Sequence, residues 1–276
     1  MGKTLLFIHG CDQESPPGVA DDDARLREYI DSINRDWLAG LSRGLVLARS
    51  QPVSDDEVVF PFYADHFRQR VREYEANGGR PPELEIRTTA ELGWSDSLRS
   101  PVRRTAPQFL SRLLTNVAYY FELDGMRRAV LNIVEDALRE RNPGGGPVVV
   151  VGHGLGSVVA YDLLTRLSDD IDVRLLVTAG SPLGHPIVQK NLLGGENNRR
   201  PRVPRRLVAR RAAWVNAYDV QDFASLVHPI AGGFDGSPAD QIVDQRTFNP
   251  TDPHSIAGYL ADPDVSGPIG HAMHEG

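Results

Sequence analysis

Short apolar runs alternate with longer amphipathic segments along this chain. The clearest runs are residues 4–8 and 148–151, which have the composition of strands buried on both faces of a sheet. Similar runs predict strands at residues 58–63, 173–178 and 213–218. Because helical segments separate these strands, the pattern predicts an α/β fold with a mostly parallel central sheet and helices on both of its faces.

Helical spacing of apolar residues marks most of the intervening segments. The predicted helices run from the acidic N-cap residues 21–23 to about Leu47, and over residues 64–77, 126–141 and 155–167. Apolar residues also recur at helical spacing over residues 109–121. This segment is either part of a helical lid at about residues 94–124 or a plain packing helix of the core.

Two further segments are predicted to lack regular structure. Residues 182–206 have the composition of a long polar loop, and the last residues, with His271 and His274, that of a Gly/Pro-rich tail.

Composition and charge narrow the class of protein. The 276 residues are 41% apolar and 24% charged, which is typical of folded globular proteins, and we expect one domain over residues 1–276. The net charge of −7 provides no basic field for nucleic acid, so nucleic acid is not an expected partner. The sequence contains no signal-peptide pattern, no run near the ~20 apolar residues of a membrane span, and one cysteine, Cys11. We therefore expect a cytoplasmic protein without an intrachain disulfide.

A glycine-rich turn carries the strongest indication of function. The sequence from Gly152 to Gly156 is Gly-His-Gly-Leu-Gly, and it lies between a predicted strand and a predicted helix. This arrangement resembles the nucleophile elbow of the α/β-hydrolase fold, in particular the lipase and esterase type whose elbow is Gly-His-Ser-Leu-Gly. The outer glycines match that motif, but Gly154 occupies the position of the nucleophilic serine.

The first predicted strand and its turn extend the resemblance. Phe-Ile-His-Gly at residues 7–10 is similar to the strand end that supplies part of the oxyanion hole in this family. The resemblance implies that the backbone amides of Cys11 and Leu155 are the two oxyanion donors.

Two later segments resemble those that carry the acid and the base. Asp222 follows a predicted strand and best matches the acid position, with Asp219 as the alternative. His254 matches the family's histidine, which opens a short helix with an aromatic residue five places on. The order of elbow, acid and histidine along the chain is the order that the fold requires. The resemblance therefore implies Asp222 and His254 as the partners of a nucleophile at residue 154.

Glycine has no nucleophilic atom, so the chain as written cannot form an acyl-enzyme through Gly154. Four explanations stay open. Gly154 replaces a serine in an otherwise complete carboxylic ester hydrolase, or the protein binds an acyl compound without turnover. Alternatively, His254 activates water or supports lyase-like chemistry in the vacated space, or Ser157 or Cys11 is a displaced nucleophile. Whether this chain is an enzyme is therefore undecided by its sequence.

Three further histidines are candidates for lining the pocket. His9 and His153 belong to the two turns that frame the site, where hydrogen bonding to loop backbone is the commoner role, and His185 follows a later glycine-containing turn. No metal-ligand spacing such as His-Glu-x-x-His occurs, so we expect neither a metal ion nor a cofactor. The expected ligand is a small-molecule acyl ester or a related hydrophobic compound.

Overall fold

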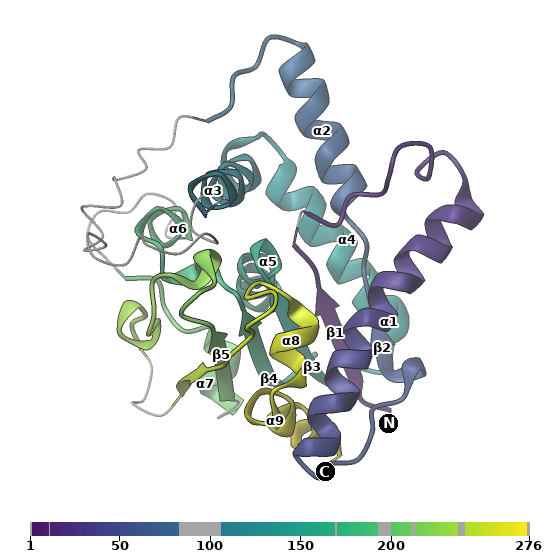
Figure 1. Cartoon of the computed structure of the whole chain (residues 1–276), viewed down its shortest axis with the longest axis vertical. Coiled ribbons are helices and arrows are strands. Elements are labelled where there is room, and N and C mark those ends of the chain that lie inside the picture. The colour runs from purple at the N-terminus through teal and green to yellow at the C-terminus, as the bar shows by residue number, and fades with distance from the viewer. Residues whose placement is uncertain are drawn as a thin grey trace.

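A parallel sheet lies at the centre of the molecule (Figure 1). The structure, a computed structural model, describes residues 2–10, 12–82, 106–168, 170–192, 200–210, 213–236 and 241–274. The six strands have the order β2-β1-β3-β4-β5-β6, and every neighbouring pair is parallel. They are β1 (Thr4–Ile8), β2 (Val58–Val59), β3 (Pro147–His153), β4 (Asp172–Ala179), β5 (Ala213–Tyr218) and β6 (Ile242–Arg246). The predicted α/β class with a parallel sheet is confirmed.

Helices connect these strands and cover the sheet. They are α1 (Asp23–Leu47), α2 (Ala64–Ala76), α3 (Ala106–Glu122), α4 (Met126–Arg141), α5 (Leu155–Arg166), α6 (Pro186–Leu192), α7 (Arg205–Arg210), α8 (Ile256–Ala261) and α9 (Pro263–His274). The N-cap of α1 is Asp22, whose carboxylate accepts the amides of Ala24 and Arg25, so the acidic run starts this helix as predicted.

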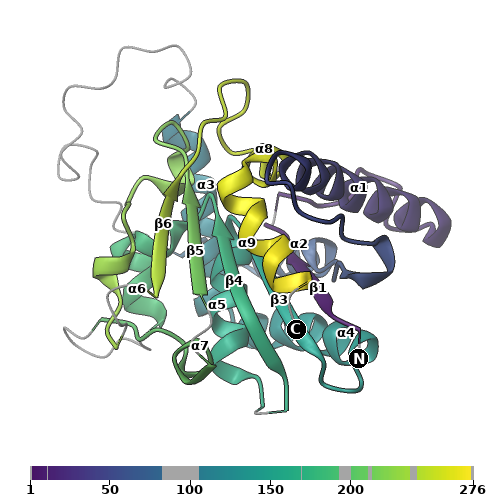
Figure 2. The same cartoon turned by 90° about the horizontal axis from the view of Figure 1, so that it is seen from below.

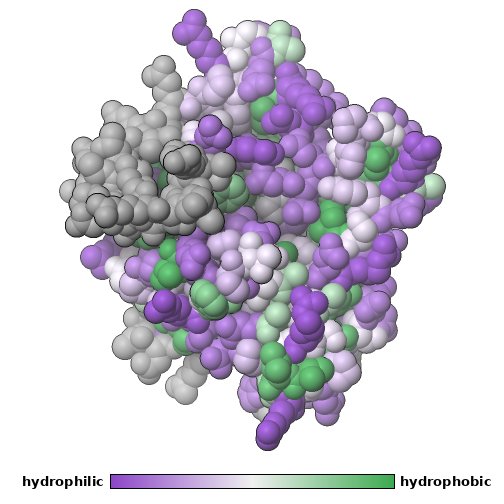
Figure 3. Space-filling view, in the orientation of Figure 1, coloured by the Kyte–Doolittle hydropathy of each residue, from purple (hydrophilic) through white to green (hydrophobic). Residues whose placement is uncertain are grey.

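Alternate residues of the strands pack into two separate apolar layers. Leu5 and Phe7 of β1 pack with α1, α8 and α9, whereas Leu6 and Ile8 pack with α2 to α5. The two groups of helices lie on opposite sides of the sheet in Figure 2. Because both faces of β3 are covered, each residue from Val148 to Val151 is at most 1% exposed. This burial explains why these strands have continuous apolar sequences. The face of the molecule seen in Figure 3 is mainly hydrophilic.

Strand β2 is shorter than predicted. The pattern predicted a strand over residues 58–63, but only Val58 and Val59 pair with β1. Pro61 has no amide hydrogen to donate to a sheet, and the amide of Tyr63 donates instead to the ring of His9 (3.2 Å). The apolar residues after β2 therefore pack around the end of β1.

Two other predictions need correction, and one strand was missed. Residues 182–206 do not form one continuous polar loop, because a 3₁₀ turn (Pro182–Gly184), α6 and the first residues of α7 lie within this range. The segment with His271 and His274 is helical in α9, where Val265, Ile269 and Met273 pack against the sheet. Strand β6 was not predicted, because only Ile242 of its five residues is buried, as expected for an edge strand.

The order of the strands determines where ligands are expected to bind. Strand β2 lies on one side of β1 and β3 lies on the other, so the direction of winding changes between β1 and β3. Open α/β sheets bind ligands outside the carboxyl ends of their strands at such a switch point. The turns that follow β1 and β3 begin with His9-Gly10 and with Gly154, so the predicted site falls at this position.

Candidate active site

The turn after β3 holds Gly154 in an unusual backbone conformation. Its φ is 54° and its ψ is −125°, a region that residues with side chains rarely adopt. The flanking glycines are required by close packing: a Cβ at Gly152 would lie 2.6 Å from the carbonyl oxygen of Gly156, and a Cβ at Gly156 would lie 2.0 Å from that of Ile8. The chain therefore makes a sharp turn from β3 into α5, with Gly154 at its centre.

A side chain at residue 154 would lie against His254. A Cβ built on Gly154 would be 3.4 Å from Nε2 of His254, an ordinary van der Waals distance. A further atom on that Cβ would thus come within reach of Nε2 by rotation about one bond. The structure accordingly has room for a short side chain between the turn and the imidazole.

The carboxylate of Asp222 lies on the other side of the same imidazole. Nδ1 of His254 is 2.9 Å from Oδ2 and 3.0 Å from Oδ1 of Asp222. Two further donors hold this carboxylate, namely the hydroxyl of Tyr259 (2.7 Å to Oδ2) and the amide of Ala224 (2.8 Å to Oδ1). Asp222 is 1% exposed, so its orientation is set by these bonds.

Asp219 makes different contacts. Its Oδ1 accepts the amide of Gln221 (2.8 Å) and its Oδ2 accepts the amide of Asn249 (2.6 Å). The backbone amide of Asp219 donates to the hydroxyl of Tyr259 (3.0 Å). Of the two acids that the sequence left open, Asp222 is therefore the one that contacts His254, and Asp219 fixes the surrounding loops.

The pKa of His254 is raised above the usual histidine value. Burial by itself lowers this pKa, but the charge of Asp222 and its hydrogen bond to Nδ1 outweigh the burial, and the charges of Asp12 and Asp252 add to the rise. With Nδ1–H donating to Asp222, Nε2 is the atom that can take a proton from a group at residue 154.

Close packing of two helices places His254 over the elbow. Gly40 and Gly44 of α1 lie against α8, and a Cβ on them would come within 2.5 Å of Ala257 O and 2.2 Å of Leu260 O. These glycines allow α8 to approach α1, and the loop that precedes α8 carries His254. The contact between α1 and α8, which are far apart in the sequence, thus sets the position of the imidazole relative to the sheet.

The two histidines of the framing turns have structural partners. Nδ1 of His9 is 2.5 Å from the carbonyl oxygen of Gly10, and Nε2 accepts the amide of Tyr63, a pattern that fits the neutral Nδ1–H tautomer. Burial lowers the pKa of His9 to about 4. Nε2 of His153 donates to the carbonyl of His254 (2.8 Å), and burial followed by the nearby His254 charge lowers the pKa of His153 well below its usual value.

The predicted oxyanion donors are described only in part. Leu155 begins α5, where the first amides of a helix have no intrahelical partner and carry a partial positive charge. A Cβ on Gly10 would be 3.9 Å from the amide nitrogen of Leu155, so the end of β1 lies beside this donor. Cys11, the other predicted donor and an alternative nucleophile, lies outside the described residues. Ser157 donates its hydroxyl to the carbonyl of Gly152 (2.9 Å) and is fully buried.

A cavity of about 630 Å³ opens beside His254. The described residues that line it include His153 and the residues around Asp222, together with Trp37 of α1 and Phe109 of α3. Phe109 lies edge-on to the imidazole of His254, with ring centroids 4.9 Å apart. His9 and His185, both predicted as pocket residues, are not part of this lining; Nδ1 of His185 accepts the amide of Ile187 (3.3 Å) at the start of α6.

Helix α3 is tied to the loop after β1 by ion pairs. Arg112 of α3 contacts Asp12 (2.9 Å) and Glu14 (3.2 Å), and Glu14 also contacts Arg68 of α2 (3.0 Å). The middle of α3 is buried in the core, so within the described residues it serves as a packing helix whose first turns cover His254. Residues 94–105 of the suggested lid lie outside the described residues.

Sequence reasoning did not identify the contribution of Gly180. Its φ is +52°, and a Cβ on it would be 2.6 Å from Oδ2 of Asp222 and 2.9 Å from Nδ1 of His254. Only a residue without a side chain leaves room for this pair. The sequence did place Gly180 directly after a predicted strand, which follows the glycine turn in the order that the resemblance implies. The aromatic walls Trp37 and Phe109 gave no signal beyond ordinary helical periodicity.

The described residues provide neither a metal site nor a membrane-spanning helix. These residues contain no group of three or more His, Cys, Asp or Glu side chains placed to hold a metal ion. None of the described helices is both long enough and apolar enough to pass through a membrane.

Comparison with protein-family models, with curated proteins and with solved structures finds no match to this chain.

Proposed function

We propose that this chain has the α/β-hydrolase fold and carries the site of a carboxylic ester hydrolase of the lipase and esterase type, with Gly154 in place of the nucleophile. In this proposal the chain as written binds an acyl ester or a related acyl compound and does not form an acyl-enzyme. The observation that carries it is the alignment of Asp222, His254 and the place of a Cβ on Gly154, with His254 between the other two.

In a complete version of the site, a serine at residue 154 would attack the ester carbonyl. Nε2 of His254 would take the serine proton and later pass it to the leaving alcohol, while Asp222 would hold the imidazole and stabilise its charged form. The amide of Leu155 would donate to the oxyanion. The one group that these steps lack is a side chain at residue 154, and the turn has space for it.

The backbone of Gly154 supports this proposal over accidental similarity. A residue with φ near +54° is strained unless it is glycine, and such strain is typical of the nucleophile position in the elbow. Glycine releases that strain, so the chain as written keeps the shape of the elbow without its reactive group.

The first prediction concerns the substitution Gly154→Ser. We expect the variant to react with a fluorophosphonate probe at residue 154 and to hydrolyse a short nitrophenyl ester about 10⁴-fold or more faster than the chain as written. The substitution should also lower the free energy of unfolding by about 1–3 kcal/mol, because a side chain enters a left-handed conformation. Intact-protein mass spectrometry, initial rates and chemical denaturation measure the three effects.

Two double variants serve as controls, Gly154→Ser with His254→Ala and Gly154→Ser with Asp222→Asn. Both should lose labelling and turnover. If the folded Gly154→Ser variant resists the probe, residue 154 is not at a nucleophile position and the proposal is wrong.

The second candidate function is hydrolysis by water that His254 activates directly. The space at Gly154 next to Nε2, together with the raised pKa of this histidine, favours it. This mechanism predicts that the chain as written hydrolyses the ester and that the His254→Ala variant does not. A rate in the chain as written that persists in His254→Ala would instead exclude this site as its source.

A further inference from the structure

The cavity beside His254 has walls of two kinds. Phe109 and Phe223 are half-buried and supply aromatic surface, whereas Trp37 is 1% exposed and presents almost none of its ring. Besides Asp222, three carboxylates line it, those of Asp12, Asp36 and Asp252, and they come from three different elements, namely the loop after β1, helix α1 and the loop before α8. Arg43 is the only arginine or lysine among the described lining residues. The charge along the walls is therefore predominantly negative.

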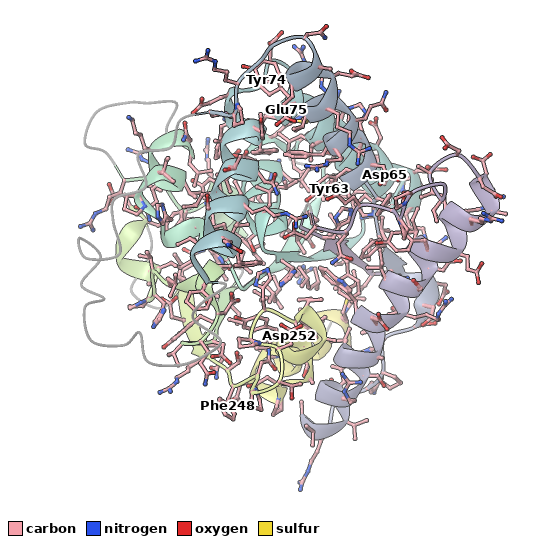
Figure 4. The ribbon with its side chains drawn as sticks, turned by 45° about the horizontal axis from the view of Figure 1, so that its top comes forward. Tyr63, Asp65, Tyr74, Glu75, Phe248 and Asp252 are labelled. Carbon is pink, nitrogen blue, oxygen red and sulfur yellow. The ribbon has the colours of Figure 1, made fainter. Side chains whose placement is uncertain are left out.

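These carboxylates are not all neutralised by protein cations. Asp12 is 2.9 Å from Arg112, but neither Asp36 nor Asp252 takes part in an ion pair within the described part of the chain. The charges of Asp12 and Asp252 both act on the imidazole of His254. Figure 4 shows Asp252 beside the start of α8, on the loop that carries His254. The negative charge therefore reaches the place where chemistry would occur.

The aromatic wall is independent of the carboxylates. Phe109 and Phe223 both line the cavity and are half-buried, so part of each ring is accessible. Phe109 also lies edge-on to the imidazole of His254, so aromatic surface lies close to the place where an acyl group would react.

We infer that this cavity selects acyl compounds that carry a positively charged amine or quaternary ammonium group, and that it disfavours those with a second, negatively charged end. The inference rests on the proposed function, because it names the substrate class of the same site. Carboxylates attract the cation, and the aromatic rings of Phe109 and Phe223 attract it through their ring quadrupoles. An anionic end would meet several carboxylates of the same sign.

The first test measures binding to the chain as written. The probes are hydrolysis-resistant amides of equal length that end in a trimethylammonium group, an uncharged tert-butyl group of the same shape, or a carboxylate. Calorimetry at low salt should show the trimethylammonium amide binding about tenfold more tightly than the tert-butyl amide, with the carboxylate amide the weakest. Equal or weaker binding of the trimethylammonium amide than of its uncharged isostere would overturn the inference, whatever the activity of the protein.

The second test uses the Gly154→Ser variant and nitrophenyl or alkyl esters with the same three ends. One series places the variable end on the acyl side, and the other places it on the alcohol side. The trimethylammonium ester should have the highest kcat/KM in at least one series, and added salt should reduce this preference. Hydrolysis of all esters without such a preference would overturn the inference and leave the proposed function standing. Failure of every ester would count against the proposed function, and the binding test would still decide the inference.

Charge-neutral variants identify the residues responsible. Asp36→Asn and Asp252→Asn should each reduce the trimethylammonium preference about threefold, because each removes one of the wall charges. Asp31→Asn is the matched control, since Asp31 lies on the same helix as Asp36 but outside the cavity lining, and it should leave the preference unchanged. A preference that survives in the Asp36→Asn/Asp252→Asn double variant would exclude these carboxylates as its cause.

Discussion

Single residues with no side chain decide how closely the polar groups of the site approach one another. Gly180 and Gly154 both have positive φ, and both lie next to the imidazole of His254, one at the Nδ1 side and one at the Nε2 side. They differ in the space available. A Cβ fits at Gly154, whereas a Cβ at Gly180 would collide with Asp222 and His254. Gly154 therefore leaves free space beside Nε2 of His254, whereas the space beside Gly180 is occupied by the side chains of Asp222 and His254.

This difference leads to a prediction for Gly180→Ala. The added methyl group should push Asp222 and His254 apart, because it would lie 2.6 Å from Oδ2 of Asp222. We expect the downfield NMR resonance of the His254 Nδ1 proton to disappear and the free energy of unfolding to fall by about 1–3 kcal/mol. In the Gly154→Ser background, labelling by the fluorophosphonate should be lost. Retention of the Nδ1 resonance would show that the pair tolerates the methyl group and that our account of Gly180 is incorrect.

At the scale of secondary-structure elements, the contact between β1 and α5 sets the position of the elbow. Gly156, in the first turn of α5, lies directly against the carbonyl groups of Ile8 and His9 at the end of β1. Two backbone segments meet here, and backbone cannot move aside as a flexible side chain can.

We therefore predict that Gly156→Ala destabilises the protein by about 3 kcal/mol or more, because its Cβ would lie 2.0 Å from Ile8 O and 2.5 Å from His9 O. Gly232→Ala is the control, since a Cβ there meets no atom within 4 Å, and it should change the free energy of unfolding by less than about 0.5 kcal/mol. Urea denaturation of both variants checks this. Similar stabilities for the two would refute the close contact.

Exposed ion pairs join helix α3 to the loop after β1. The side chain of Arg112 is 57% exposed, so its pairs with Asp12 and Glu14 should contribute less than about 1 kcal/mol to global stability. Their effect should instead be local, because they join α3 to the loop after β1 where Phe109 covers His254.

For Arg112→Gln we accordingly expect faster hydrogen exchange in the first turns of α3 and in residues 12–14, with little change in global stability. Arg25→Gln is the control. It removes the exposed ion pair between Arg25 and Asp22 at the start of α1, and it should leave exchange in α3 unchanged. High salt should bring the parent chain toward the Arg112→Gln behaviour. If exchange in α3 is the same in both variants, the ion pairs do not hold this helix.

For the molecule as a whole, the buried histidines link stability to pH. His9 is fully buried and its pKa is lowered to about 4 by that burial, whereas in the unfolded chain it would titrate near 6.5. Between these two values the unfolded state binds the proton and the folded state does not, so stability falls as pH falls. The raised pKa of His254 has the opposite effect on stability. Its stabilising contribution is fully present below about pH 6.5 and is lost as the pH rises through the folded-state pKa.

We predict that acidification from pH 6.5 to pH 4 removes about 3 kcal/mol of stability through His9 alone. The variant His9→Gln keeps a donor and an acceptor but cannot titrate, so its deficit relative to the parent should shrink over this range. Denaturation curves across the range measure these slopes, and a deficit for His9→Gln that does not depend on pH would contradict the assignment.

The sequence by itself determined the parts of this protein that depend on neighbours along the chain. The apolar runs of β1 and β3, the acidic cap of α1 and the glycine turn after β3 each follow from local propensity and from burial on both faces of a sheet. The expectation of one domain over residues 1–276 and the hydrolase resemblance stay predictions.

Only the tertiary structure decided the features that join distant segments. Asp219 and Asp222 are three residues apart in one loop, and no local pattern shows that Asp222 meets His254 while Asp219 binds loop amides. Strand β6 has few buried residues, so its pairing at the edge left little trace in the sequence. The cavity walls come from α1, α3 and the loops around β5 and α8. Such contacts depend on how complete elements pack, and a short window of sequence contains no information about the partner it will meet.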